Sequence, residues 1–257
     1  MSRACVFCLD AEARLTVEDV IPTWYLERRK GFAPTVHVVT RFGTTKGYQP
    51  RSLKVASKVL CKECNSVRLG QVQDRAAPYL RHMVDGEPTE LDVPAQTAVA
   101  AWLSMTALTW QWAIGDVDKI PDRIRADFLA APFPKRPPAG VAVWIGHRAN
   151  EPGRSTLVNS YYLDTVRTLH LREGSAPLDP NRNPAPFGAT ICVEHFVGQV
   201  AGHSIPGGDI AFDLQAAGRF WETIWPPRRT VIRWPAHDPI DKPTLIALER
   251  AFNEPGT

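Results

Sequence analysis

Cys5-Val6-Phe7-Cys8 is followed, farther along the chain, by a second stretch with the same cysteine spacing, Cys61-Lys62-Glu63-Cys64. We expect the fold to be built around these two stretches. Each is a pair of cysteines separated by two residues, the spacing with which one tight turn presents two thiolates to a single metal ion. Two such turns complete a tetrahedral four-sulfur zinc site. A closed site of this kind has no position for water, so the sequence predicts a structural Zn²⁺. The alternative is that the four cysteines are unrelated core residues.

The remaining composition is that of a globular protein. The chain has 257 residues, of which 44% are apolar and 22% charged, enough for one large domain or two modest ones without long disorder. No secretory signal precedes Cys5 and no apolar run reaches about eighteen residues, so we expect a cytoplasmic protein with no membrane partner. In a reducing cytosol the paired cysteines bind metal instead of forming disulfides. Cys192 lies in an apolar run and is expected to be buried.

The charge distribution says more than the net charge of +3. From residue 28 to residue 68 there are ten Lys or Arg residues and a single acidic residue, Glu63. Such an excess of positive charge is typical of a surface that binds the phosphate backbone of a nucleic acid. The alternative is an ordinary solvated face. The expected phosphate contacts are Arg41, Lys46, Arg51, Lys54 and Lys58.

The chain divides into two predicted units, residues 1–90 and 91–257. In the first we expect a hairpin over 13–21, an exposed basic loop over 43–50 and a helix over 65–81 disturbed at Pro78. In the second, an apolar helix over 96–112 is expected to be buried, with its tryptophans in the core; base stacking is the alternative. Strands are predicted over 141–145, 156–163, 168–171, 189–200 and 230–234. The fold class is therefore α+β, with an antiparallel sheet packed on the helix.

An acidic pair, Glu18-Asp19, lies between the cysteine pairs. Nuclease chemistry needs a divalent metal beside the scissile phosphate and a base that activates water. Carboxylate and amide oxygens suit Mg²⁺ or Mn²⁺, so Glu18 and Asn65 are expected to bind such an ion on one side of the zinc scaffold, with Asp19 facing the water. Alternatively, Asn65 is only the N-cap of the following helix and Glu18 a rim carboxylate.

The order Cys-x-x-Cys, Leu-Thr-x-Glu-Asp-Val-Ile-Pro-x-Trp, Cys-x-x-Cys-Asn resembles the zinc-containing HNH endonucleases, over roughly residues 5–80. These are treble-clef, ββα-metal nucleases, among them the phage junction-resolving endonuclease VII type. The resemblance implies that Glu18 and Asn65 bind the catalytic metal. Asp19 stands where the family usually has its general-base His, and a carboxylate is a weaker base near neutral pH. His37 and His82 are the nearest substitutes, unless they are ordinary surface or packing histidines.

The sequence thus predicts a metal-dependent endonuclease that hydrolyses phosphodiester bonds in DNA, with RNA and a homodimer left open. The rival is a zinc-stabilised DNA-binding or assembly module without catalysis, which would bind zinc and no second metal. A third interpretation makes the C-terminal sheet the functional centre, binding a partner or a small ligand.

Overall fold

The computed structural model describes residues 4–19, 24–25, 37–41, 44–48, 56–113, 124, 127–128, 136–149, 157–162, 169–171, 187–203, 208–210, 218–241, 243–245 and 247–248. The backbone alone is described at 18–19, 37–41, 44–48, 56–59, 110–113, 157–162, 169–171, 187 and 208–210. Within these residues the fold is mixed α+β with antiparallel sheets, as predicted. No helix in these ranges is long and apolar enough to cross a membrane.

Strand β1 (Leu15–Asp19) pairs antiparallel with β4 (Ala56–Cys61), and Leu15 faces Cys61. The predicted local hairpin over 13–21 is wrong for its described part, residues 13–19, because Leu15–Asp19 is a single strand whose partner lies far along the chain. After β4 the chain passes almost directly into the π-helical segment η1 (Glu63–Leu69) and helix α2 (Gly70–Asp85). The resulting order is two antiparallel strands followed by a helix.

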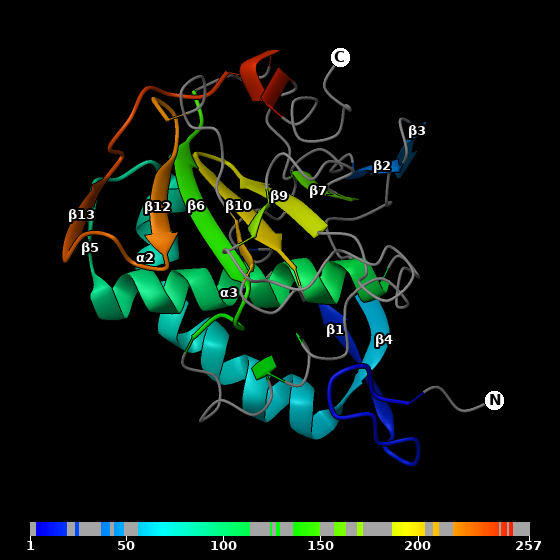
Figure 1. Cartoon of the computed structure of the whole chain (residues 1–257). Helices are drawn as coiled ribbons and strands as arrows, with labels where there is room; N and C mark the ends of the chain where they lie inside the picture. Colours follow the sequence, from blue (N-terminus) through cyan, green and yellow to red (C-terminus); the bar gives the residue numbers. More distant parts are fainter. Residues whose placement is uncertain are drawn as a thin grey trace.

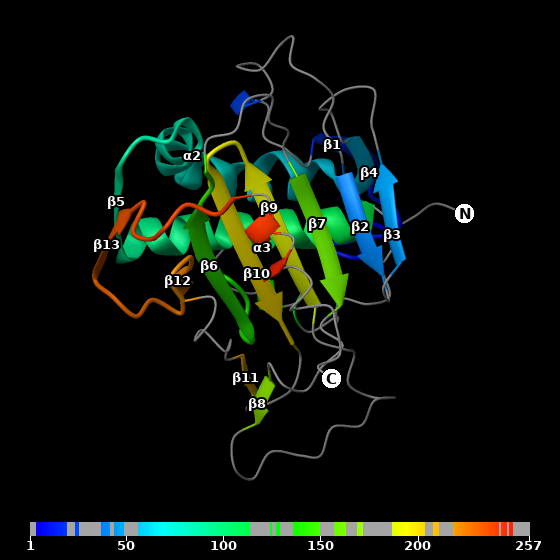
Figure 2. The same cartoon turned by 90° about the horizontal axis from the view of Figure 1, so that it is seen from above.

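A hairpin of two short strands lies in the basic region of the sequence. Strand β2 (His37–Arg41) pairs with β3 (Thr44–Tyr48), and the two lie beside the edge strand β7 (Leu157–Tyr162) of the central sheet (Figure 2). The prediction of a loop over 43–50 is therefore wrong for residues 44–48. Threonine and tyrosine favour strands, and that preference prevails over the glycines and the charge.

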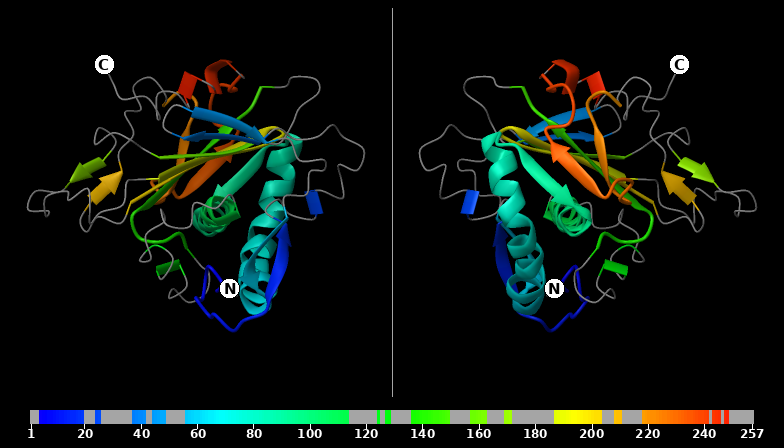
Figure 3. Two further views of the ribbon diagram at one scale, coloured as in Figure 1. Left: turned by 90° about the vertical axis from the view of Figure 1, so that its right-hand side faces the viewer. Right: turned by 90° about the vertical axis from the view of Figure 1, so that its left-hand side faces the viewer.

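Helix α3 (Val93–Ala113) is the centre of the fold. It lies between α2 and the central sheet, with β1 and β4 near its C-terminal end (Figures 1 and 3). The Asp92 carboxylate caps its first turn by accepting from the Ala95 amide at 2.8 Å. Trp102 is 2% exposed, so the prediction of a core tryptophan is confirmed at this position. Pro78 lies inside α2 without ending it.

The central sheet has the order β12 (Glu222–Trp225), β6 (Val141–His147), β10 (Phe196–Gly202), β9 (Phe187–Val193), β7. The predicted single strand over 189–200 is two strands, because the chain turns at Glu194 with a φ of 52°. Every residue of β10 is buried, which explains why apolar and polar residues do not alternate along it. Gly198 lets α3 approach, since a Cβ there would lie 2.2 Å from Leu103 Cδ2.

Two smaller pairings complete the described structure: β5 (Thr89–Asp92) with β13 (Val231–Trp234), and β8 (Leu169–Leu171) with β11 (Gly208–Ile210). One hydrophobic cluster runs through both predicted units and includes Leu60, Met83, Leu103 and Phe196. The division at residue 90 stays a prediction.

Candidate metal centre

The two cysteine pairs meet in space. The sulfurs of Cys5, Cys8, Cys61 and Cys64 all lie within 4.8 Å of one another. The Sγ atoms of Cys8 and Cys61 are 3.8 Å apart. Four sulfurs that each lie about 2.3 Å from a tetrahedral zinc ion are about 3.8 Å from one another. The predicted cluster therefore exists, and its dimensions fit a metal ion such as zinc.

The backbone around the cluster is arranged for thiolates. The amide of Cys61 donates to Cys5 Sγ at 3.3 Å, and the amide of Cys64 donates to Cys61 Sγ at 3.4 Å. The first turn is closed by a 2.8 Å hydrogen bond from the Leu9 amide to the Cys5 carbonyl. Leu9 takes a φ of 60°, the left-handed conformation that lets the chain fold back at this point. Amide donors aimed at sulfur favour its ionised form.

Three of the cluster thiols, those of Cys5, Cys8 and Cys64, have pKa values shifted from the ordinary value of a thiol. A hydrogen bond from the Cys64 thiol, followed by backbone amides, lowers the pKa of Cys5 to about 4 against the opposing effect of burial. The same contact with Cys5, followed by burial, raises the pKa of Cys64. Cys8 is exposed at the surface, and the partial desolvation of its sulfur, followed by the neighbouring Cys5 thiol, raises the pKa of Cys8. Crowded thiols ionise together only when a cation offsets their charge, and a bound divalent metal supplies that charge.

Asn65 connects the end of this cluster to β1. Its Nδ2 donates to Thr16 Oγ1 at 3.0 Å and to the Val17 carbonyl at 3.2 Å. The Thr16 hydroxyl uses its only proton on the Leu60 carbonyl at 3.1 Å, so it accepts from Asn65. Both partners of Asn65 are therefore acceptors, which identifies the atom facing them as the amide nitrogen and turns Oδ1 away from β1.

The interpretation of Asn65 as a helix N-cap is wrong. Helical backbone begins before Asn65, at Lys62, and no side chain caps that end of η1. The side chain of Asn65 bonds to another strand instead of to its own helix. Its position therefore serves the junction between η1 and β1.

Glu18 and Asp19 are placed by their backbone alone. They end β1, opposite Ser57 and Ala56 of β4. The Val17 carbonyl that accepts from Asn65 immediately precedes Glu18 in the chain. A meeting of the Glu18 carboxylate with Asn65 stays a prediction.

The expected phosphate contacts divide between described and undescribed parts of the chain. Arg41 lies on β2 opposite Thr44, Lys46 lies on β3, and Lys58 lies on β4. Arg51 and Lys54 fall outside the described residues. The structure thus places these positions on two separate strand pairs, and their role remains a prediction.

The two substitute bases have different positions. His37 is on β2, where only its backbone is described. His82 lies in the last turn of α2 and pairs with Glu87. About 20 Å or more of continuous helix separates it from Asn65, at about 1.5 Å per residue. His82 is thus a surface histidine and not the base of this site.

One connection between the predicted units carries no sequence signal. The Tyr25 hydroxyl donates to Glu194 Oε1 at 2.8 Å, across 169 residues, and Tyr25 is 2% exposed. The neighbouring Trp24 ring lies under the Arg81 guanidinium, 5.5 Å from its centroid. The short segment that follows the acidic pair is therefore held against both α2 and the turn between β9 and β10.

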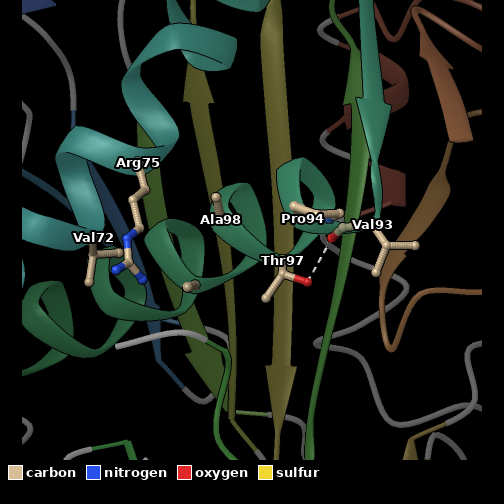
Figure 4. A pocket seen from close by; sticks show the side chains of 7 residues that line it. Val72, Arg75, Val93, Pro94, Thr97 and Ala98 are labelled. Carbon is tan, nitrogen blue, oxygen red and sulfur yellow. Dashed lines mark hydrogen bonds between the residues drawn. The ribbon is translucent and has the colours of Figure 1, made fainter. Parts of the chain in front are cut away.

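A hollow of about 370 Å³ lies between α2 and α3 (Figure 4). Its lining is Val72, Arg75, Val93, Pro94, Thr97, Ala98 and Ala101. The Thr97 hydroxyl donates to the Val93 carbonyl at 2.8 Å, so its proton is already used. The lining offers no carboxylate, thiol or imidazole, so this hollow supplies no side chain for metal binding or acid–base chemistry.

No protein-family model, curated protein or solved structure matches the chain.

Proposed function

We propose that the protein is a zinc-stabilised, metal-dependent endonuclease of the HNH type that hydrolyses phosphodiester bonds in DNA. In this proposal the four cysteines hold a structural Zn²⁺. Beside it, Glu18 and Asn65 bind Mg²⁺ or Mn²⁺, ions that take only one or two ligands from the protein and keep several waters. The order of β1, β4 and the η1–α2 helix is that expected of a ββα-metal unit.

The observation that carries the proposal is the anchored amide of Asn65. Its nitrogen is fully used by Thr16 and Val17, so its oxygen is the atom left for a cation. Among the described residues Oδ1 has no hydrogen-bond donor. The anchoring strand leads directly into Glu18. An amide oxygen held this way, together with the Glu18 carboxylate, would form a suitable pair of ligands for a hard divalent ion.

Each residue then has a distinct role in hydrolysis. The bound ion would stabilise the charge that develops on the phosphate oxygens. Glu18 and Asn65 hold the ion, and Asp19 accepts the proton of the attacking water or adds a ligand. Arg41, Lys46, Arg51, Lys54 and Lys58 hold the backbone of the DNA by charge, independently of its sequence.

A second candidate is a DNA-binding or assembly module that keeps the zinc and has lost hydrolysis. The observation in its favour is Asp19, a weaker base than histidine near neutral pH. The two candidates differ in their metals, because the module predicts zinc and no second ion.

Titration of the zinc-loaded protein with Mn²⁺, followed by calorimetry or electron paramagnetic resonance, separates them. The nuclease predicts one Mn²⁺ site per chain that is lost in Glu18→Ala and in Asn65→Ala. Glu63→Ala is the matched control, since Glu63 is an exposed carboxylate in the same turn and pairs only loosely with Arg68, at 3.8 Å. Failure of Mn²⁺ to bind, with DNA still retarded on a gel, would favour the module.

A further inference from the structure

The cysteine cluster has one exposed member. Cys8 is exposed, whereas Cys5, Cys61 and Cys64 are 0%, 6% and 1% exposed. Oxidation of cysteine by peroxides follows thiolate character and exposure, and a metal-bound cysteine is a thiolate. An oxidant dissolved in water therefore reaches the Cys8 sulfur before the other three.

The exposed sulfur also has a partner. Cys61 Sγ lies 3.8 Å from Cys8 Sγ and belongs to the other cysteine pair, 53 residues away. A disulfide of about 2.05 Å requires the two sulfurs to approach by about 1.8 Å. Cys8 is the exposed last residue of its turn and is followed by Leu9, which is 53% exposed, while Cys61 is fixed in β4 by its pairing with Leu15. The approach can therefore be made from the Cys8 side, where the chain leaves the buried part of the turn.

We propose that Cys8 is an oxidative modification site for hydrogen peroxide and that Cys61 is its resolving partner. The Cys8 thiolate attacks one peroxide oxygen, the O–O bond breaks, and Cys8 becomes a sulfenic acid as hydroxide leaves. The Cys61 thiolate then attacks the Cys8 sulfur, the S–O bond breaks and a second hydroxide leaves as the disulfide forms. Two electrons pass from the two sulfurs to the peroxide.

The modification replaces a metal cross-link between the two cysteine pairs with a disulfide. Zinc joins the two cysteine pairs through four thiolates. It is released when two of these thiolates are consumed in a disulfide. The Cys8–Cys61 disulfide still joins the same two turns, so the strands β1 and β4 stay connected. A disulfide within either pair, Cys5–Cys8 or Cys61–Cys64, would instead leave the turns unlinked. The inference rests on zinc in the cluster and is independent of nuclease activity.

The test uses the full chain after its zinc content has been measured as one ion per chain. Increasing hydrogen peroxide is added, released zinc is followed with a chromogenic chelator, and disulfides are mapped by mass spectrometry after free thiols are blocked. We expect zinc release in step with one disulfide, Cys8–Cys61, and recovery of zinc binding after treatment with dithiothreitol and zinc. Cys192→Ala is the control and should release zinc at the wild-type rate.

Three results obtained with the zinc-loaded chain would overturn the proposal. They are a first disulfide within one cysteine pair, oxidation of Cys5 or Cys64 before Cys8, and zinc retention at peroxide concentrations that oxidise a free thiol. Because the disulfide map is made on the wild-type chain, the result does not depend on a cysteine variant that no longer holds zinc. A chain that binds no zinc would also overturn it, and the zinc measurement separates that result from a failure of DNA cleavage.

Discussion

Asn65 and Thr16 are joined by a 3.0 Å hydrogen bond across 49 residues of sequence. The Thr16 hydroxyl donates a hydrogen bond to the Leu60 carbonyl, so one short chain of hydrogen bonds connects η1, β1 and β4. Strand β1, which includes Glu18, and segment η1, which carries Cys64, are thereby held together. This junction is where the proposed divalent-metal site would form.

Asn65→Asp is expected to destabilise the zinc-loaded protein by about 1–3 kcal/mol, because a carboxylate oxygen would face two acceptors, Thr16 Oγ1 and the Val17 carbonyl. Asn65→Ala should cost less, since water can reach the exposed Val17 carbonyl. Urea unfolding measures both changes in the free energy of unfolding. Equal stability of Asn65→Asp and the wild type would show that the amide is oriented the other way.

Removal of the metal is expected to unfold the region around the two cysteine turns. Free energies of about 10–16 kcal/mol have been associated with structural zinc in small zinc-finger peptides, so Cys64→Ser should lose zinc and cooperative unfolding together. Cys192→Ala, which alters a buried cysteine outside the cluster, should keep its zinc and lose about 1 kcal/mol. Metal analysis and thermal unfolding test this. Unchanged melting of Cys64→Ser would mean that the cluster holds no metal.

The contact of α3 with the sheet can be tested at a glycine. Gly198→Ala should cost about 1–3 kcal/mol, because its Cβ would lie 2.2 Å from Leu103 Cδ2. Gly70→Ala is the matched control, since the nearest atom to its Cβ is 4.0 Å away and its backbone is helical. It should stabilise the chain by up to about 1 kcal/mol. Opposite shifts in the urea midpoint are expected, and shifts of the same sign would contradict the packing of α3.

Tyr25→Phe tests whether the two predicted units are tied together. It removes the hydrogen bond to Glu194 from a buried position and should cost about 1 kcal/mol. In a double-mutant cycle with Glu194→Ala, the two changes should not be additive. Additive losses would mean that the two side chains do not interact in solution.

Asp19→His is expected to increase DNA nicking near neutral pH, because imidazole is the better base there, and Asp19→Asn should decrease it. A faster rate for Asp19→His would show that residue 19 acts as the base. If Asp19 were instead a metal ligand, its replacement by histidine would weaken Mg²⁺ binding and lower the rate. Initial rates at saturating Mg²⁺ give the comparison. If neither variant changes the rate, Asp19 is not the base.

The parts of this fold that the sequence predicts are those with local signals. The cysteine spacing predicts which four side chains share one metal ion, and an apolar run such as 96–112 is long enough to be recognised as a buried helix. The pairing of β1 with β4 and the bond from Tyr25 to Glu194 join residues far apart in sequence, so no local pattern indicates them. The turn at Glu194 lacks glycine, proline or asparagine, which explains why the β9–β10 hairpin was predicted as one strand.

Cleavage of supercoiled plasmid by the zinc-loaded protein is the direct test of whether it is a metal-dependent endonuclease. Reactions with Mg²⁺, Mn²⁺ or EDTA are run for the wild type, for Glu18→Ala with Asn65→Ala, and for the control Glu63→Ala. We expect nicking that requires Mg²⁺ or Mn²⁺, is abolished in the double variant and is retained in Glu63→Ala. Nicking that persists in the double variant, or no nicking by a zinc-loaded wild type with either ion, would contradict it.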